Sequence, residues 1–170
     1  MKASLCLLLF CVMPAAAGVR LEAAHWQLLV GGKGRDARRR ADIERLALTP
    51  GVPLEGRLLA RVGLRNRGPV VEGLLLRYAV EAKVERLVAP GSSPVWALPY
   101  LLDEKRVPLA PANQVFEATV DPTSLTKRYL QALRREGYWP VELRIRFMLK
   151  PRLDDQEPLR IVEAALPIGR

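Results

Sequence analysis

The sequence predicts a mainly all-β protein, an antiparallel immunoglobulin-like or fibronectin-like β-sandwich of about seven or eight strands. Apolar and polar residues alternate with a period of two along most of the chain, as in strands with one buried face. Turn-forming residues separate these segments, and only one segment has helical periodicity. Strands and helices do not alternate, which argues against a parallel sheet. A small β-barrel is the structural alternative.

The N-terminal segment is typical of a secretory signal peptide. Met1 and Lys2 precede an apolar run over 5–13, then Pro14 and the small residues 15–17. We therefore expect a signal peptide over 1–17, cleaved before Gly18, and a single sandwich domain over 18–170. Such a domain is long enough to bury a core. No later apolar run is long enough to predict a transmembrane segment in the mature chain.

Both cysteines, Cys6 and Cys11, fall in the predicted signal peptide, so the mature chain would contain no disulfide. Neither asparagine, Asn66 nor Asn113, is followed by the glycosylation pattern. These features favour a bacterial envelope protein, exported to the periplasm or the extracellular space.

The first half of the mature chain predicts three strands. The first lies within 19–30, and the basic segment 33–45 is expected to form a surface loop with at most one helical turn. The next strand places Leu54, Leu58, Ala60, Val62 and Leu64 inward. After the turn at 66–69, a long strand places Leu74, Leu76, Tyr78, Val80, Ala82 and Val84 inward.

Two short strands follow, over 95–102 and 106–109, joined by the polar residues 103–105. Pro99 and Pro108 cannot donate ladder hydrogen bonds, so we place both strands at a sheet edge. A further strand over 114–120 directs Phe116, Ala118 and Val120 inward.

One amphipathic helix is predicted near 122–136. Asp121 suits the N-cap, Pro122 suits the first helical position and Gly137 suits the stop. The helical wheel gathers Leu125, Tyr129, Leu130, Ala132 and Leu133 on one side. It gathers Lys127, Arg128, Gln131, Arg134 and Arg135 on the other.

The strand over 141–149 has the clearest alternation in the chain, with Leu143, Ile145 and Phe147 inward. Its outward positions include Arg144, whose replacement by serine is expected to cost less than ~1 kcal/mol. An acidic loop over 152–158 and a last strand over 159–166 complete the domain.

Catalytic and cofactor signals are nearly absent. The one histidine, His25, stands beside Trp26 at a strand, and none of the mature serines has the glycine-flanked setting of a nucleophile. The acidic pair Asp154–Asp155 lacks the spacing of a calcium loop. We therefore expect a non-enzyme with no catalytic residue, no metal site and no cofactor.

Positive charge gives the main candidate binding surfaces. Lysine and arginine number 27 against 18 acidic residues, a net charge of +9. The candidate residues are Arg38, Arg39 and Arg40 in the loop, and Lys127, Arg128, Arg134 and Arg135 on the helix. Such clusters attract anionic lipid or acidic polysaccharide. The alternative is a solvated surface in which Glu81 and its neighbours pair with Arg144 and Arg146 across strands.

Two aromatic residues, Trp96 and Tyr100, share one parity with Leu98 and Leu102 on the proline-marked edge, so they are candidate partner contacts. The leading hypothesis is a non-catalytic exported binding or assembly module that contacts another envelope or secreted protein. The alternative is a binding protein for an anionic lipid or glycan. Export and the lack of interleaved basic and aromatic residues argue against nucleic acid.

Overall fold

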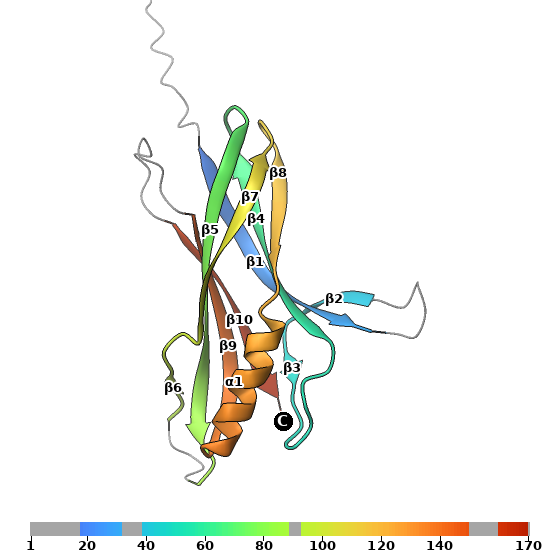
Figure 1. The fold of residues 1–170 in the computed structure, drawn as a ribbon, viewed down its shortest axis with the longest axis vertical. Coiled ribbons are helices and arrows are strands. Elements are labelled where there is room, and N and C mark those ends of the chain that lie inside the picture. Colours follow the sequence, from blue (N-terminus) through green and yellow to red (C-terminus); the bar gives the residue numbers. More distant parts are fainter. Residues whose placement is uncertain (1–17, 32–38, 89–92, 150–159, 170) are drawn as a thin grey trace, which may run out of the picture.

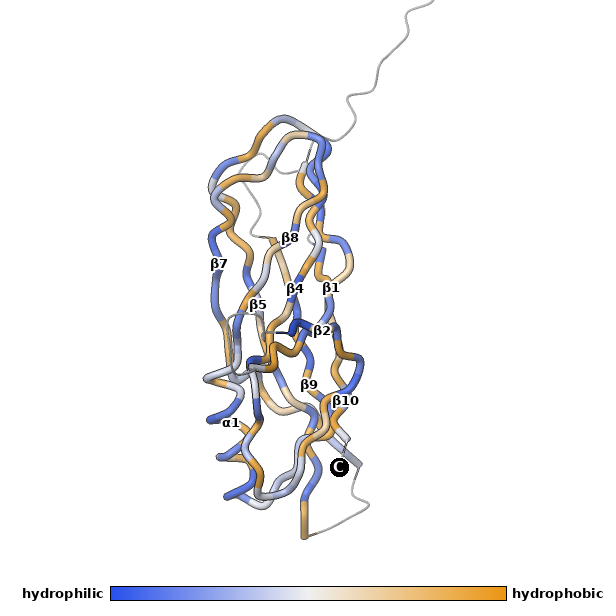
Figure 2. The backbone as a smooth tube through the Cα atoms, turned by 90° about the vertical axis from the view of Figure 1, so that its right-hand side faces the viewer, coloured by the Kyte–Doolittle hydropathy of each residue, from blue (hydrophilic) through white to orange (hydrophobic). Residues whose placement is uncertain are grey.

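A computed structural model describes residues 18–31, 39–88, 93–149 and 160–169. The described chain is mostly β, with two sheets and one helix, and it is elongated in both views (Figures 1 and 2). The smaller sheet has the order β2-β1-β4-β8, with every neighbouring pair antiparallel. Its strands are β1 (Val19–Val30), β2 (Arg39–Ile43), β4 (Arg57–Asn66) and β8 (Val115–Val120).

The larger sheet has the order β3-β10-β9-β5-β6, and β7 also pairs with β5. Its strands are β3 (Leu46–Ala47), β5 (Val71–Arg86), β6 (Val95–Trp96), β7 (Leu101–Ala110), β9 (Tyr138–Leu149) and β10 (Ile161–Gly169). The first half of β5 pairs with β7, and its second half pairs with β6. Together β6 and β7 form one free margin of the sheet, as Pro108 in β7 predicted, whereas Pro99 lies between the two strands and belongs to neither.

The all-β prediction is confirmed, with more strands than the seven or eight expected. Each sheet ends in strands that have no further neighbour in the described part of the chain. The β-barrel alternative is therefore wrong for the described residues, because neither sheet closes on itself.

The core lies between the sheets and draws buried side chains from both, together with the helix. Leu58 of β4 and Leu143, Ile145 and Phe147 of β9 have no exposed surface. The indole Nε1 of Trp26 in β1 donates to the backbone oxygen of Ala164 in β10 at 3.0 Å, which ties the two sheets together. Hydrophobic and hydrophilic positions alternate along the strands (Figure 2). The predicted inward positions of β4, β5 and β9 are largely confirmed.

The predicted helix is present as α1 (Thr123–Arg135). The N-cap is Pro122 rather than the predicted Asp121, although Asp121 still accepts the Thr123 N–H at 3.1 Å. Gly137 follows the helix with a φ of +78°, a left-handed conformation that glycine adopts without strain. The buried face differs from the predicted one. It contains Thr123, Thr126, Leu130 and Leu133, whereas Leu125 and Ala132 are exposed.

Two segments expected to be irregular are strands. Residues 39–43, placed in a surface loop, form β2 against β1. The polar residues 103–105, placed in a turn, lie within the continuous strand β7. Both are edge strands that pair with a neighbour on one side only. Their polar side chains can therefore remain in solvent while the backbone forms ladder hydrogen bonds with that neighbour. Local polarity alone therefore did not distinguish them from loops.

The outer face of the larger sheet carries a compact charge network. Glu81, with an 8% exposed side chain, accepts from Arg144 Nε at 2.6 Å and lies 3.0 Å from Arg146 Nη2. The Arg144 guanidinium also stacks on the Trp96 ring, at 3.8 Å from the ring centroid. The predicted cross-strand pairing is confirmed here, but placing Arg144 in solvent is wrong, because its side chain is only 17% exposed.

Candidate functional site

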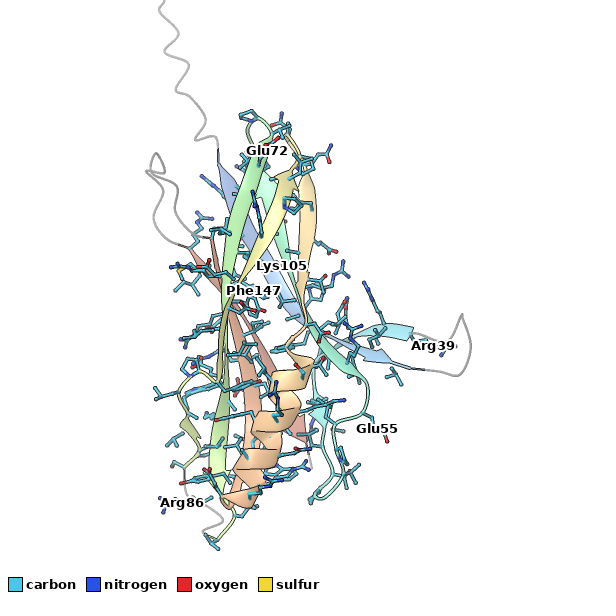
Figure 3. All side chains as sticks on the ribbon, viewed as in Figure 1. Arg39, Glu55, Glu72, Arg86, Lys105 and Phe147 are labelled. Atoms are coloured by element: carbon cyan, nitrogen blue, oxygen red, sulfur yellow. The ribbon has the colours of Figure 1, made fainter. Side chains whose placement is uncertain are left out.

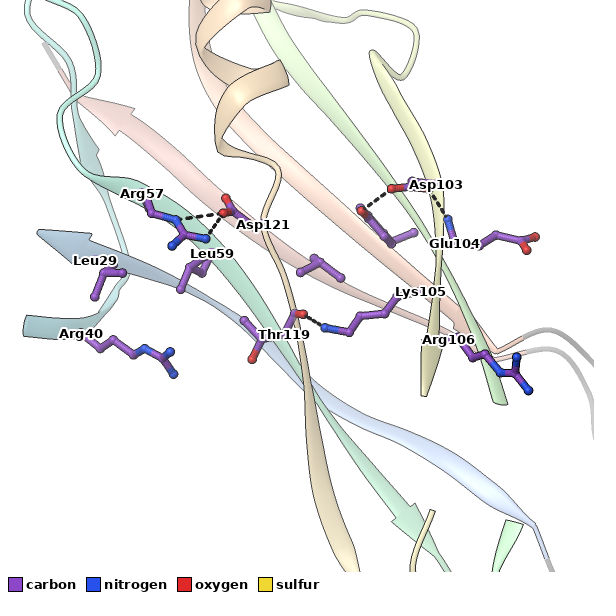
Figure 4. A pocket seen from close by; sticks show the side chains of 12 residues that line it. Leu29, Arg40, Arg57, Leu59, Asp103, Glu104, Lys105, Arg106, Thr119 and Asp121 are labelled. Atoms are coloured by element: carbon purple, nitrogen blue, oxygen red, sulfur yellow. Dashed lines mark hydrogen bonds and ion pairs between the residues drawn. The ribbon is translucent and has the colours of Figure 1, made fainter. Parts of the chain in front are cut away.

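A cleft of about 590 Å³ lies where the edge strands β7 and β8 face each other (Figure 4). One side comes from the smaller sheet, including the end of its edge strand β8, and the other side comes from β5 and β7 of the larger sheet. The lining residues are Leu29, Arg40, Arg57, Leu59, Tyr78, Asp103, Glu104, Lys105, Arg106, Thr119, Val120 and Asp121. The buried side chains of Leu29, Leu59 and Val120 supply apolar surface. The other nine lining residues are polar or charged, so the cleft suits a polar or charged ligand.

The cleft has more cations than its carboxylates neutralise. Arg57 is paired, with Nε donating to Asp121 Oδ2 at 2.9 Å. Arg40 and Arg106 have no carboxylate partner among the described residues. Lys105 Nζ donates to the backbone oxygen of Thr119, across the gap between β7 and β8 (Figure 4). Of these three cations, Lys105 points between the two sheets, whereas Arg40 lies on β2, at the opposite edge of the smaller sheet from β8, and Arg106 is aligned with Leu75 on the outer face of β5.

The position of Lys105 follows from strand parity. Lys105 is aligned with Leu76, an inward residue of β5, so its side chain points between the sheets rather than away from them. An inward charge on an edge strand is one way in which proteins prevent uncontrolled strand pairing. Its ammonium group also donates a hydrogen bond to a backbone carbonyl of the facing edge strand β8, so that carbonyl is not free to pair with another strand.

Two groups in the cleft have shifted pKa values. Burial alone would raise the pKa of Asp121, but hydrogen bonds from Thr123 and Arg57 outweigh it, so the pKa is lowered. Burial, followed by the hydrogen bond to Asp103, raises the pKa of Tyr78 well above its usual value. Tyr78 therefore remains a neutral donor to Asp103 Oδ2, at 2.8 Å.

The described residues offer little for catalysis. His25 lies on the β1–β2 pair with Nε2 3.6 Å from Asp42. Within the described ranges, no cluster of histidine, cysteine and acidic side chains could hold a metal ion. The absence of an enzymatic activity remains a prediction.

Of the three predicted loop arginines, one lies at the cleft. Arg40 lines it, whereas Arg39 lies at the start of β2 on a two-stranded ribbon that projects from the body (Figure 3). Both side chains are exposed. Arg38 lies outside the described residues.

The four predicted helix cations do not share one free face. Arg134 donates to the backbone oxygen of Val52 at 3.1 Å, and its guanidinium stacks on Trp139 at 5.3 Å from the ring centroid. Lys127 is half-buried beside Pro53 and Leu54, in the loop that contains Val52, whereas Arg128 and Arg135 are exposed. Arg134 therefore holds the helix to the 49–54 loop.

The two predicted aromatic contacts lie on opposite faces of the larger sheet. Trp96 lies on the outer face against Arg144. Tyr100 stacks on Tyr129 of the helix, with ring centroids 4.1 Å apart, and its hydroxyl lies 2.9 Å from Thr126 Oγ1. The shared parity fails because residues 97–100 are not a strand, so alternation does not continue from 96 to 100.

A second hollow, of about 460 Å³, lies on the outer face of the larger sheet beside β7. Ala79 of β5 is the small residue between Leu102 of β7 on one side and Met148 of β9 and Ile161 of β10 on the other. Leu102 is 74% exposed. This hollow is more apolar than the cleft, and ion pairs of Arg77 with Glu104 and of Arg146 with Glu81 flank it.

Sequence reasoning missed Arg57, Lys105 and Arg106 as candidate binding residues. Arg57 is an isolated cation within a strand, and Lys105 and Arg106 form only a pair, so a search for longer runs of basic residues does not select them. Lys105 was detectable in principle, because a lysine on an inward position of an edge strand departs from the alternation around it.

No helix in the described ranges is long and apolar enough to cross a membrane. The chain matches no protein-family model, and a search of the curated proteins finds no match.

Proposed function

We propose that this protein is an exported, non-catalytic binding or assembly module of the cell envelope, which holds an extended acidic segment of a partner protein in the cleft between β7 and β8. The observation that carries the proposal is Lys105, an inward cation between the edge strands β7 and β8 that has no carboxylate partner among the described residues and lies beside the buried Val120. Peptide recognition by strand addition uses free sheet edges of this kind.

Lys105 suggests how such a segment would bind. In the free protein its ammonium group bonds the Thr119 carbonyl. An acidic segment would offer Lys105 a carboxylate, a stronger partner than a neutral carbonyl. The Thr119 carbonyl would then be free to accept a backbone N–H from the incoming strand. Lys105 would thus block nonspecific pairing and select for acidic partners.

The immunoglobulin-like or fibronectin-like relationship also remains a proposal. Two mainly antiparallel sheets around a common core support it. An anionic lipid headgroup or an acidic glycan is the alternative occupant of the cleft, because cations also line it.

Site-specific photo-crosslinking in the producing cell tests the proposal. A crosslinking residue at Arg106 should trap one protein through an acidic segment, and a matched crosslinker at the exposed Arg128 should not. Lys105→Glu should abolish the adduct without unfolding the protein, because Lys105 is only half-buried. A lipid or glycan adduct at position 106, or equal adducts at both positions, would contradict the proposal.

Export has its own test. Protein recovered from the envelope should begin at or near Gly18 on N-terminal sequencing. A cytoplasmic product that retains Met1 would contradict export.

A further inference from the structure

We propose that the end of the molecule formed by the β5–β6 hairpin and the C-terminus of α1 docks on an anionic membrane surface. We call this end the hairpin tip and define it by Arg86, Leu87, Val88, Val95 and Arg135. The tip lies at the lower end of Figure 1, where β5 and α1 both finish. It is separate from the cleft, so docking there would leave the cleft open to a partner.

The apolar part of the tip is unusually exposed. Val88 is 90% exposed, Val95 61% and Leu87 45%. Single exposed apolar residues are common, but a group at the end of one hairpin is typical of an interaction site. Shallow insertion of such side chains between lipid headgroups removes apolar surface from water.

Cations accompany these apolar side chains. Arg86 and Arg135 are exposed, and neither has a carboxylate partner within the described ranges. The Arg86 guanidinium lies 6.0 Å from the ring centroid of the half-buried Tyr138. Glu136 is the exposed acidic residue adjacent to Arg135. Arginines beside exposed aliphatic side chains complement a surface of anionic headgroups over a hydrocarbon layer.

The local structure presents these groups together. The Leu87 N–H donates to the Gly137 backbone oxygen at 2.8 Å, which fixes the end of β5 to the turn after the helix. Arg86 is aligned with Tyr138 in the β5–β9 ladder. Arg86 projects at the lower extremity of the molecule, where a flat surface could reach it (Figure 3). A projecting end suits a bilayer better than a partner that requires a groove.

Co-flotation with lipid vesicles tests the proposal, using the full-length processed protein purified from the producing cell. The probes are phosphatidylcholine vesicles with and without phosphatidylglycerol. The wild type should float with the anionic vesicles and bind less as salt rises. The double variant Arg86→Ser/Arg135→Ser should weaken this binding about twenty-five-fold, because each basic residue near an anionic surface contributes a factor of about five. Val88→Ser should weaken binding to both kinds of vesicle.

Matched control variants distinguish binding through the tip from nonspecific binding of exposed apolar or cationic residues and from binding through the cleft. Leu102→Ser removes a comparably exposed aliphatic side chain elsewhere, and Arg39→Ser removes a comparably exposed cation. Both should bind vesicles as the wild type does, and so should Lys105→Glu. Equal losses in the tip variants and these controls would overturn the proposal, as would equal wild-type binding to neutral and anionic vesicles.

A crosslinker at Val88 distinguishes a protein partner. Lipid adducts are expected, and a single protein adduct without vesicle binding would overturn the membrane assignment. The cleft proposal fails independently, through the crosslink at position 106.

Discussion

Arg144 holds the buried carboxylate of Glu81 and covers Trp96. We expect Arg144→Ser to destabilise the protein by about 1.5–3 kcal/mol, because Glu81 would lose a partner while it remains mostly buried. Arg146 would still contact Glu81, which limits the loss. Arg77→Ser is the matched control on the same face. Its pair with Glu104 is exposed, so it should cost less than about 1 kcal/mol in a chemical denaturation series. Equal losses would contradict the distinction.

Asp121 is expected to make the free energy of unfolding depend on pH in the acidic range. Its pKa is lowered in the folded protein, so its contribution is present above the ordinary value of 3.8 and is lost as the pH falls through the folded value. Asp121→Asn should therefore be less stable than the wild type by about 0.5–1 kcal/mol at neutral pH, and the difference should shrink below pH 3.8. Denaturation midpoints across this range measure it. A constant difference between Asp121→Asn and the wild type across this range would contradict the assignment.

At the scale of elements, alternation predicted the strands that have one buried face. The inward rows of β4, β5 and β9 follow from period-two patterning, and Asp121 and Gly137 bracket the helix. Sequence could not predict β2, because a strand paired on one side and exposed at all positions but Ile43 leaves no alternation. It also could not assemble the cleft, whose residues come from strands distant in the chain. That juxtaposition depends on the pairing of β7 with β5 and β8 with β4.

The edge position of β7 predicts a role for Lys105 in preventing self-association. Lys105→Val should leave the fold stable but remove the inward charge between β7 and β8, so the free edges should pair with other copies. Sedimentation velocity over a range of protein concentrations should show oligomers. Lys83→Val is the matched control, because half-buried Lys83 lies on β5, which has partners on both sides. A monomeric Lys105→Val protein would show that the lysine does not protect the edge.

At the scale of the whole molecule, the shared core predicts that both sheets and the helix unfold together. Buried residues from all three form one cluster, and Trp26 bonds across it to β10. Leu58→Asp in the smaller sheet and Ile145→Asp in the larger should therefore each unfold the entire domain, because each places an unpaired charge at a site with no exposed surface. Leu102→Asp, at a 74% exposed position, should leave it folded. In the wild type, denaturation followed by far-ultraviolet circular dichroism and by tryptophan fluorescence should give coincident transitions. Separate transitions, or an aspartate variant that loses only one sheet, would show that the two sheets fold independently and that residues 18–170 are not one cooperative domain.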